Sequence, residues 1–282
     1  MCIRDRYSTK AYFTWEHFKF AIKHYNRFFD VDAGTSDTDF RKQILDDMRP
    51  ILMEYENLIP VGSVFYRARK NDPSLNFESL IINKELSPAP PKHAQTNRMS
   101  PAGISYLYVS SEKETACAEC RYTNADVIIA QYIAKQELQI IDFSEDVYIT
   151  NQSIFSEKYD HDLYWLNHFL KLFAAEISKP VNCEKSDHSY EYAATQVIAE
   201  YIRSLGYDGI CYKSSVSKGK SYCFFCGPDF EFCKNDYGII LNDSEYYQIP
   251  QSFLDLFSID SISLLQVSES GNLHDPIKIR NQ

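Results

Sequence analysis

The chain has 282 residues, and its 29 Lys and Arg side chains are outnumbered by 39 Asp and Glu, which gives a formal net charge of −10. This acidic balance argues against direct binding of nucleic acid, because neutralising phosphate groups requires a basic surface. Apolar residues make up 44% of the chain, enough for a large folded core. None of the nine glycines lies two residues from another, which excludes a dinucleotide site built on a G-x-G-x-x-G loop.

The sequence contains no predicted membrane segment. No apolar run approaches the roughly 18 residues of a membrane span, and no apolar signal region follows residues 1–6. We therefore expect a cytoplasmic protein that does not bind membranes. The eight cysteines are too sparse for a disulfide framework, so we expect them to be reduced.

Two amphipathic helices are predicted at the start of the chain. Apolar residues recur at helical spacing over residues 15–29 and again over residues 40–52. At residues 63–69 the apolar period changes to the two-residue period of a strand. This change predicts a domain boundary near residue 60, with a small N-terminal helical region over 1–60 and the main domain over 61–282.

The main domain mixes strands and helices without a regular βαβ repeat. A polar, proline-rich stretch over residues 71–103 has the composition of a long loop of the kind that often carries function. The pattern from Ser111 to Glu114 is typical of a capping box at the start of a helix that carries Glu119. Further strands are expected at 106–110, 126–134, 138–143, 209–213, 221–225, 238–241 and 261–266, and further helices at 163–177 and 190–205. This irregular alternation predicts the α+β class.

Two arginines stand out on the first strand of the main domain. Arg67 and Arg69 are two residues apart and therefore share a face, whereas Val64, Tyr66 and Ala68 are predicted to face the core. Two guanidinium groups on one face can bind a pyrophosphate. A solvated edge strand would show the same pattern, so this segment alone leaves both interpretations open.

A series of short motifs decides between these interpretations. It consists of Asn97-Arg98-Met99-Ser100-Pro101-Ala102-Gly103, the strand from Tyr106 to Ser110, Ala118-Glu119-Cys120, Gln196, Gly206-Tyr207-Asp208-Gly209-Ile210, and Tyr212-Lys213-Ser214-Ser215. In this order and spacing the motifs resemble the RES domain, a bacterial family named for its Arg, Glu and Ser residues. The resemblance covers residues 60–230, and the helices before residue 60 resemble the HEPN-type segment that precedes RES domains in longer members.

The resemblance implies an ADP-ribosyltransferase-like fold, with a mixed β core and flanking helices. It also implies an enzyme that consumes NAD by cleaving the bond between nicotinamide and ribose, with phosphate or water as the acceptor. Some members are described as ADP-ribosylating a protein instead. NAD would then be a substrate, inorganic phosphate a co-substrate candidate, and no bound cofactor is expected. RES proteins usually act as toxins restrained by an antitoxin with a helix-turn-helix domain, so we expect such a partner. The oligomeric state, a homo-oligomer included, stays open.

Four residues are catalytic candidates: Glu119, Tyr108, Arg67 and Ser214. Cleavage of an N-glycosidic bond passes through an oxocarbenium-like transition state, which a carboxylate beside the ribose stabilises. Glu119 is the candidate for this role. Tyr108 would pack its ring on the nicotinamide.

Two of these catalytic candidates, Arg67 and Ser214, would act by binding phosphate or ribose, together with Arg98, Arg69 and Ser215. Arg67 and Arg98 would hold the diphosphate or an incoming phosphate, because a planar guanidinium binds such oxygens through two donors. Arg69 would lie at the rim. Ser214 would donate to a phosphate or ribose oxygen, and its neighbour Ser215 fits the pattern equally well.

Two other interpretations stay open at the level of sequence. Cys117-x-x-Cys120 and Cys223-x-x-Cys226 together supply the four thiolates of a structural zinc site, although buried reduced cysteines are the ordinary explanation and we expect no metal. A catalytically silent nucleotide-binding or regulatory module would display the same arginines without consuming NAD.

Overall fold

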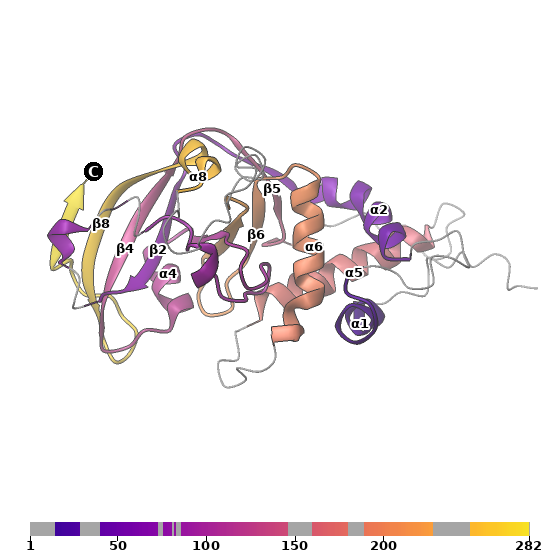
Figure 1. Cartoon of the computed structure of the whole chain (residues 1–282), viewed down its shortest axis with the longest axis horizontal. Helices are drawn as coiled ribbons and strands as arrows, with labels where there is room; N and C mark the ends of the chain where they lie inside the picture. Colours follow the sequence, from indigo (N-terminus) through magenta and orange to yellow (C-terminus); the bar gives the residue numbers. More distant parts are fainter. Residues whose placement is uncertain are drawn as a thin grey trace, which may run out of the picture.

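The computed structural model describes residues 15–28, 40–72, 76–80, 82, 86–145, 160–179, 189–227 and 249–281. Within these residues the strands form one mixed sheet, and helices flank it (Figure 1). The α+β class and the mixed β core with flanking helices are therefore confirmed. The strand predicted at 238–241 lies outside the described residues.

The sheet has nine strands in the described part of the chain. Their order is β1 (Glu56–Ile59), β5 (Leu138–Asp142), β6 (Gly209–Lys213), β7 (Lys220–Phe224), β3 (Leu107–Ser110), β2 (Val64–Lys70), β4 (Ala125–Ala134), β8 (Phe257–Val267) and β9 (Lys278–Asn281). β5 and β6 are parallel, and the other neighbouring strands are antiparallel.

The sheet opens between β2 and β3. These strands pair at a single position, Tyr66 opposite Ser110, whereas β2 pairs with β4 along its whole length from Val64 to Lys70. The sheet is thereby divided into a half around β2, β4 and β8, at the left of Figure 1, and a half around β5, β6 and β7, with β5 and β6 near its centre. The opening between the halves is the place where the candidate site is found.

The helices cover different parts of this sheet. Their bounds are α1 (Trp15–Phe20), followed by a π-helical turn (Ala21–Tyr25), α2 (Phe40–Leu52), α4 (Lys113–Cys120), α5 (His161–Ser178), α6 (Ala193–Ser204) and α8 (Gln251–Leu256), with short 3-10 turns at Met53–Tyr55, Phe77–Ser79, Pro91–His93 and Ser189–Tyr192. Helices α1, α2, α5 and α6 gather beside the half with β5 and β6, and α4 lies next to β2 (Figure 1).

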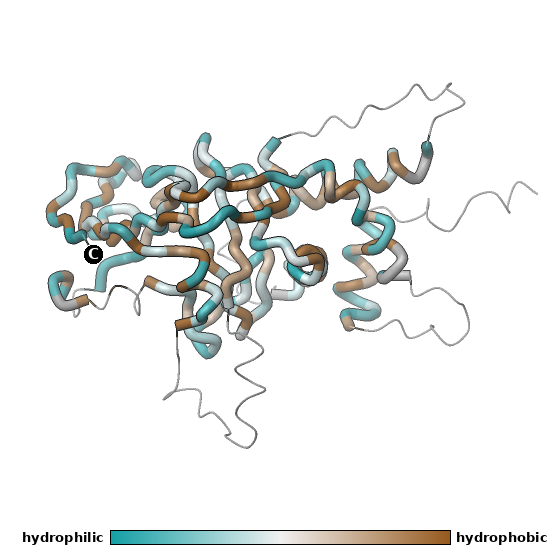
Figure 2. Tube along the Cα trace, turned by 90° about the horizontal axis from the view of Figure 1, so that it is seen from above, coloured by the Kyte–Doolittle hydropathy of each residue, from teal (hydrophilic) through white to brown (hydrophobic). Residues whose placement is uncertain are grey.

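Both faces of the β5–β7 half are buried. Ile210 and Cys223 belong to the hydrophobic cluster under helices α1, α2, α5 and α6, whereas their neighbours Cys211 and Phe224 belong to a second cluster on the other face. Consecutive residues of a strand point to opposite faces, so a strand buried on both sides reads as a continuous apolar run. In Figure 2 hydrophobic stretches lie along segments that cross the interior, and hydrophilic residues gather at bends.

The N-terminal helices pack directly on the main domain. The Trp15 ring lies 5.3 Å from the Phe169 ring and 6.0 Å from the Phe173 ring of α5, centroid to centroid. β1, just before residue 60, is a strand of the common sheet. The division of the chain into 1–60 and 61–282 stays a prediction.

The expected orientation of β2 was wrong at its start. Val64 was predicted to face the core, but it is 37% exposed, while Phe65 is buried with 3% exposed. The Phe65 ring packs 5.2 Å from that of Phe224 and 6.1 Å from that of Phe257. The second hydrophobic cluster therefore packs against the face of β2 that also carries Arg67 and Arg69. The buried Ala68 faces a different core, the one under α4.

Helix α4 also begins differently from the prediction. Glu112 stands at the N-cap, and no side chain caps the helix, so the expected capping box does not form. The Ser111 hydroxyl instead accepts a hydrogen bond of 3.0 Å from the backbone N–H of Lys220 in β7. A tertiary contact thus uses the hydroxyl that the capping box would have needed.

Candidate active site

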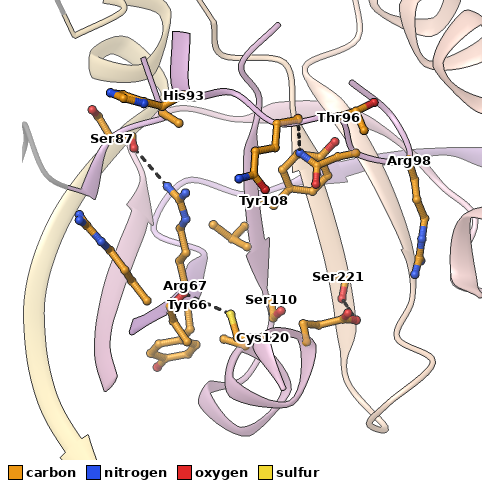
Figure 3. A pocket seen from close by; sticks show the side chains of 18 of the residues that line it. Tyr66, Arg67, Ser87, His93, Thr96, Arg98, Tyr108, Ser110, Cys120 and Ser221 are labelled. Carbon is orange, nitrogen blue, oxygen red and sulfur yellow. Dashed lines mark hydrogen bonds between the residues drawn. The ribbon is translucent and has the colours of Figure 1, made fainter. Parts of the chain in front are cut away.

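A cavity of about 950 Å³ lies where the sheet opens. Its volume is in the range typical of sites for small molecules and cofactors. Strands β2 and β3, helix α4 and the loop before β3 contribute most of the wall (Figure 3). Within the proline-rich stretch predicted as a long loop, residues 87–98 supply much of the lining of this cavity.

The charged residues that line the cavity are mainly positive. The lining contains one carboxylate, that of Glu119, and four permanently cationic side chains, those of Arg67, Arg69, Lys92 and Arg98. Because the whole chain has a formal charge of −10, this is a local concentration of positive charge in an acidic protein. Such a lining suits a ligand with more than one anionic group.

Glu119 is held by two hydroxyl groups. It lies half-buried in the last turn of α4, and its Oε1 accepts hydrogen bonds from Ser214 Oγ at 2.7 Å and Ser221 Oγ at 3.0 Å. The end of a helix carries partial negative charge, which repels a carboxylate, and the two donors offset this repulsion. Within the described residues no partner contacts Oε2, so one carboxylate oxygen is left for a ligand.

The structure separates the two neighbouring serine candidates. Ser214 is buried, and its Oγ accepts from the N–H of Val216 at 3.3 Å, which leaves its own proton for Glu119. Ser215 is exposed, and neither serine lines the cavity, so Ser214 belongs to the site through its hydrogen bond to Glu119. Ser221 was missed by sequence reasoning, because a serine at the start of a buried strand carries no signal of its own. It reaches Glu119 because β7 pairs with β3 beside α4.

Tyr108 lies in the wall of the cavity between Arg67 and Arg98 (Figure 3). Its hydroxyl is 3.0 Å from Ser100 Oγ, and burial raises the pKa of Tyr108 well above its ordinary value, so the phenol stays neutral. Tyr212 also lines the cavity, and its pKa is raised by burial and by the charge of Glu119. Two neutral aromatic side chains therefore line the cavity, and Tyr212 is the one close enough to feel the charge of Glu119.

Arg67 and Arg98 lie on opposite sides of Tyr108 (Figure 3). Arg67 Nη1 donates to the carbonyl oxygen of Ser87 at 3.1 Å. Arg98 is buried with 9% exposed, and its Nη1 donates to the carbonyl of Ile177 at the end of α5. Each guanidinium is thus oriented by a main-chain carbonyl, and the two line different parts of the cavity. Arg69 lines the cavity and is exposed, as a rim residue would be.

The loop that carries Arg98 is fastened to the start of α6. Gln196 Nε2 donates to the carbonyl oxygens of Asn97 at 2.8 Å and Ser100 at 3.1 Å. Thr195 Oγ1 donates to the carbonyl of Arg98 itself. The motif residue Gln196 therefore positions the loop, although it does not line the cavity.

The cysteine pairs do not come together as a metal site. In the part of the chain that the structure describes, no three His, Cys, Asp or Glu side chains are grouped to hold a metal ion. Cys117 and Cys120 lie on α4, with Cys120 Sγ 3.3 Å from the carbonyl oxygen of Ala68. Burial raises the pKa of Cys226 to about 12 and raises that of Cys223 as well, so these are protonated thiols in the core. The described residues give the zinc interpretation no support.

Comparison with known proteins identifies the family. The model of the RES domain matches residues 65–238, which is more than half of the chain. The chain belongs to the RES domain family. A search of solved structures finds the M. tuberculosis MbcT–MbcA toxin–antitoxin complex at 10% sequence identity and a TM-score of 0.34, covering 64% of this chain and 82% of that chain. No curated protein matches the chain.

The RES match contains the site and leaves out the first helices. It begins in β2, next to Arg67, and includes β3, α4, α6 and the β6–β7 hairpin. Helices α1 and α2 precede it. Among the described helices, none has both the length and the apolar character needed to cross a membrane.

Proposed function

We propose that this RES protein consumes NAD by cleaving the bond between nicotinamide and ribose, with phosphate or water as the acceptor. One observation carries the proposal. A carboxylate, Glu119, presents one oxygen to a cation-lined cavity while two serine hydroxyls hold the other. The family to which the chain belongs supports the same reading.

The reaction needs stabilisation of positive charge at the ribose. When the bond between the ribose carbon and the pyridinium nitrogen breaks, its electron pair goes to the nitrogen and nicotinamide leaves neutral. The ribosyl group becomes oxocarbenium-like, and a fixed carboxylate lowers the energy of that state. Water or phosphate then forms the new bond to the ribose carbon, and water loses a proton in doing so. Glu119 is the group that would stabilise the cation, and Tyr108 would pack on the nicotinamide.

The cations of the cavity match the other end of the substrate. The diphosphate of NAD is dianionic, and Arg67 and Arg98 are each oriented by a carbonyl before any ligand binds. Preorganised donors bind an anion without having to be reordered in the complex. Arg69 and Lys92 add positive charge at the same cavity.

The proposal is tested by incubating purified protein with NAD in the presence and absence of inorganic phosphate and resolving the products by mass. Nicotinamide with ADP-ribose identifies water as the acceptor, and nicotinamide with phosphorylated ADP-ribose identifies phosphate. Unchanged NAD that remains bound would contradict the proposal and favour a silent nucleotide-binding module. Consumption that requires an added protein would favour protein ADP-ribosylation.

A toxin role restrained by an antitoxin is part of the same proposal. Loss of NAD stops metabolism, so an enzyme of this kind needs a partner that blocks it in its own cell. The test is to express the protein in a bacterial host and to measure growth. If the protein consumes NAD and growth is nevertheless unaffected, the toxin role is contradicted. Co-expression of a helix-turn-helix protein encoded by a neighbouring gene is expected to restore growth.

A further inference from the structure

Three polar residues contact the β6–β7 hairpin: Ser111, which precedes α4, and Thr115 and Glu119 on the helix. Thr115 and Glu119 are four residues apart, so they lie on one side of α4. At one end Ser111 exchanges two hydrogen bonds with the backbone of Lys220, at 2.9 and 3.0 Å. At the other end Glu119 accepts from the two serines of the site. The middle residue, Thr115, has no part in the site described above.

Thr115 is fully buried against the loop that joins β6 to β7. Its Oγ1 lies 2.7 Å from Ser217 Oγ, and Ser217 Oγ accepts from the N–H of Gly219 at 3.1 Å. A side chain at position 219 would place its Cβ 2.2 Å from Thr115 Oγ1. The glycine therefore allows the backbone of the loop to press directly on the threonine hydroxyl.

The same loop carries the serine that binds Glu119. Ser214 is its first residue, and the N–H of Ser214 donates to the carbonyl of Gly219 at 3.2 Å, which closes the loop on itself. The Ser214 hydroxyl in turn links Val216 to Glu119. A displacement of the middle of the loop therefore moves the hydroxyl that holds the carboxylate.

We propose that Thr115 and Ser217 are positioning residues that hold Ser214 on Glu119. Neither of them lines the cavity, so they act through the loop and not on the substrate. The inference rests on the proposed function for its effect on catalysis, and on geometry alone for its effect on the loop. Without the Ser217 hydroxyl, the buried Thr115 hydroxyl keeps only a long contact of 3.5 Å with Glu112 Oε2, and without the Thr115 hydroxyl the half-buried Ser217 loses its partner on α4. Either change therefore favours an open loop.

Hydrogen–deuterium exchange of the 214–219 loop, followed by mass spectrometry, tests the geometric part. Thr115→Val removes the hydroxyl at nearly constant volume, and Ser217→Ala removes its partner in the loop. Both are expected to speed exchange of the loop amides about 10-fold, because each loses a hydrogen bond of about the usual strength. Thr115→Ser keeps the hydroxyl and is expected to exchange as the wild type does. Lys218→Gln, an exposed change in the same loop, is the matched control.

Steady-state cleavage of NAD by the same variants tests the catalytic part. Thr115→Val and Ser217→Ala are expected to lower kcat about 10-fold with little change in KM, because the displaced group acts in the transition state. Thr115→Ser is expected to restore kcat. Faster exchange with an unchanged kcat would overturn the proposal, and so would unchanged exchange in both hydroxyl-free variants.

The exchange experiment and the kinetic experiment together distinguish a failure of this inference from a failure of the proposed function. If the wild type leaves NAD intact, the proposed function fails, while loop exchange still decides whether Thr115 and Ser217 hold the loop. Should Thr115→Val fail to fold, Ser217→Ala and Thr115→Ser decide the outcome, since Ser217 lies in a loop at the surface.

Discussion

At the scale of single residues, the environment of Glu119 is what separates it from an ordinary glutamate on a helix surface. Its position after Tyr108 and within the motif was visible in the sequence. The second hydroxyl on its Oε1, that of Ser221, was not, because it depends on the pairing of β7 with β3. A sequence pattern reports spacing along one chain segment, whereas this contact joins residues 102 positions apart.

The structure predicts different roles for the two neighbouring serines. Ser214→Ala removes a donor to a carboxylate, so we expect kcat for NAD cleavage to fall about 10-fold, in keeping with the strength of a hydrogen bond to a charged group. Ser215→Ala removes an exposed hydroxyl outside the cavity and is expected to have little effect. Steady-state kinetics of the two variants, measured side by side, checks this. A larger loss in Ser215→Ala would reverse the assignment.

At the scale of elements, strands and helices with strong apolar patterns were predicted well, and short or edge elements were not. β6 follows a run of apolar residues that burial of both its faces requires, and α5 follows apolar residues at helical spacing that pack into one cluster. β1, α8 and β9 were missed because each is four to six residues long and owes its form to a neighbour in the sheet or the core. The first helix ends in a π-helical turn, and Tyr25 is 64% exposed, although its spacing placed it on the apolar face.

The attachment of the Arg98 loop to α6 gives a prediction at this scale. Gln196→Leu removes two hydrogen bonds to loop carbonyls, so the loop should move away from its binding geometry and KM for NAD should rise about 10-fold. Glu200→Gln, one turn further along α6 and exposed, is the control and should leave KM unchanged. Kinetic constants of both variants decide the matter. An unchanged KM in Gln196→Leu would show that the loop is held by other contacts.

At the scale of the whole molecule, an acidic protein contains a cationic cavity. The net charge of −10 was visible in the sequence, but the sequence could not show which of the 29 basic residues meet. Lys92 was missed because a lysine in a polar loop looks like a solvated side chain. The opening between β2 and β3 brings it together with Arg67 and Arg69.

This charge distribution predicts a salt-dependent affinity for phosphate groups. Raising NaCl from about 50 to about 300 mM screens exposed charges, so ADP should bind several-fold more weakly while adenosine binding stays unchanged. Lys92→Gln should weaken ADP binding, whereas Lys213→Gln, an exposed lysine outside the cavity, should not. Calorimetric titration with ADP and adenosine checks this. Equal salt dependence for the two ligands would contradict a phosphate site.

The most direct test of the whole account is the rate of nicotinamide release from NAD by Glu119→Gln. This variant keeps the shape of the side chain and removes its charge, and Glu114→Gln, an exposed glutamate on the same helix, is its control. We predict that Glu119→Gln releases nicotinamide about 100-fold more slowly, or not at all, while it binds ADP and unfolds thermally as the wild type does. Release at the wild-type rate by the folded variant would contradict the assignment of Glu119 to the ribosyl cation.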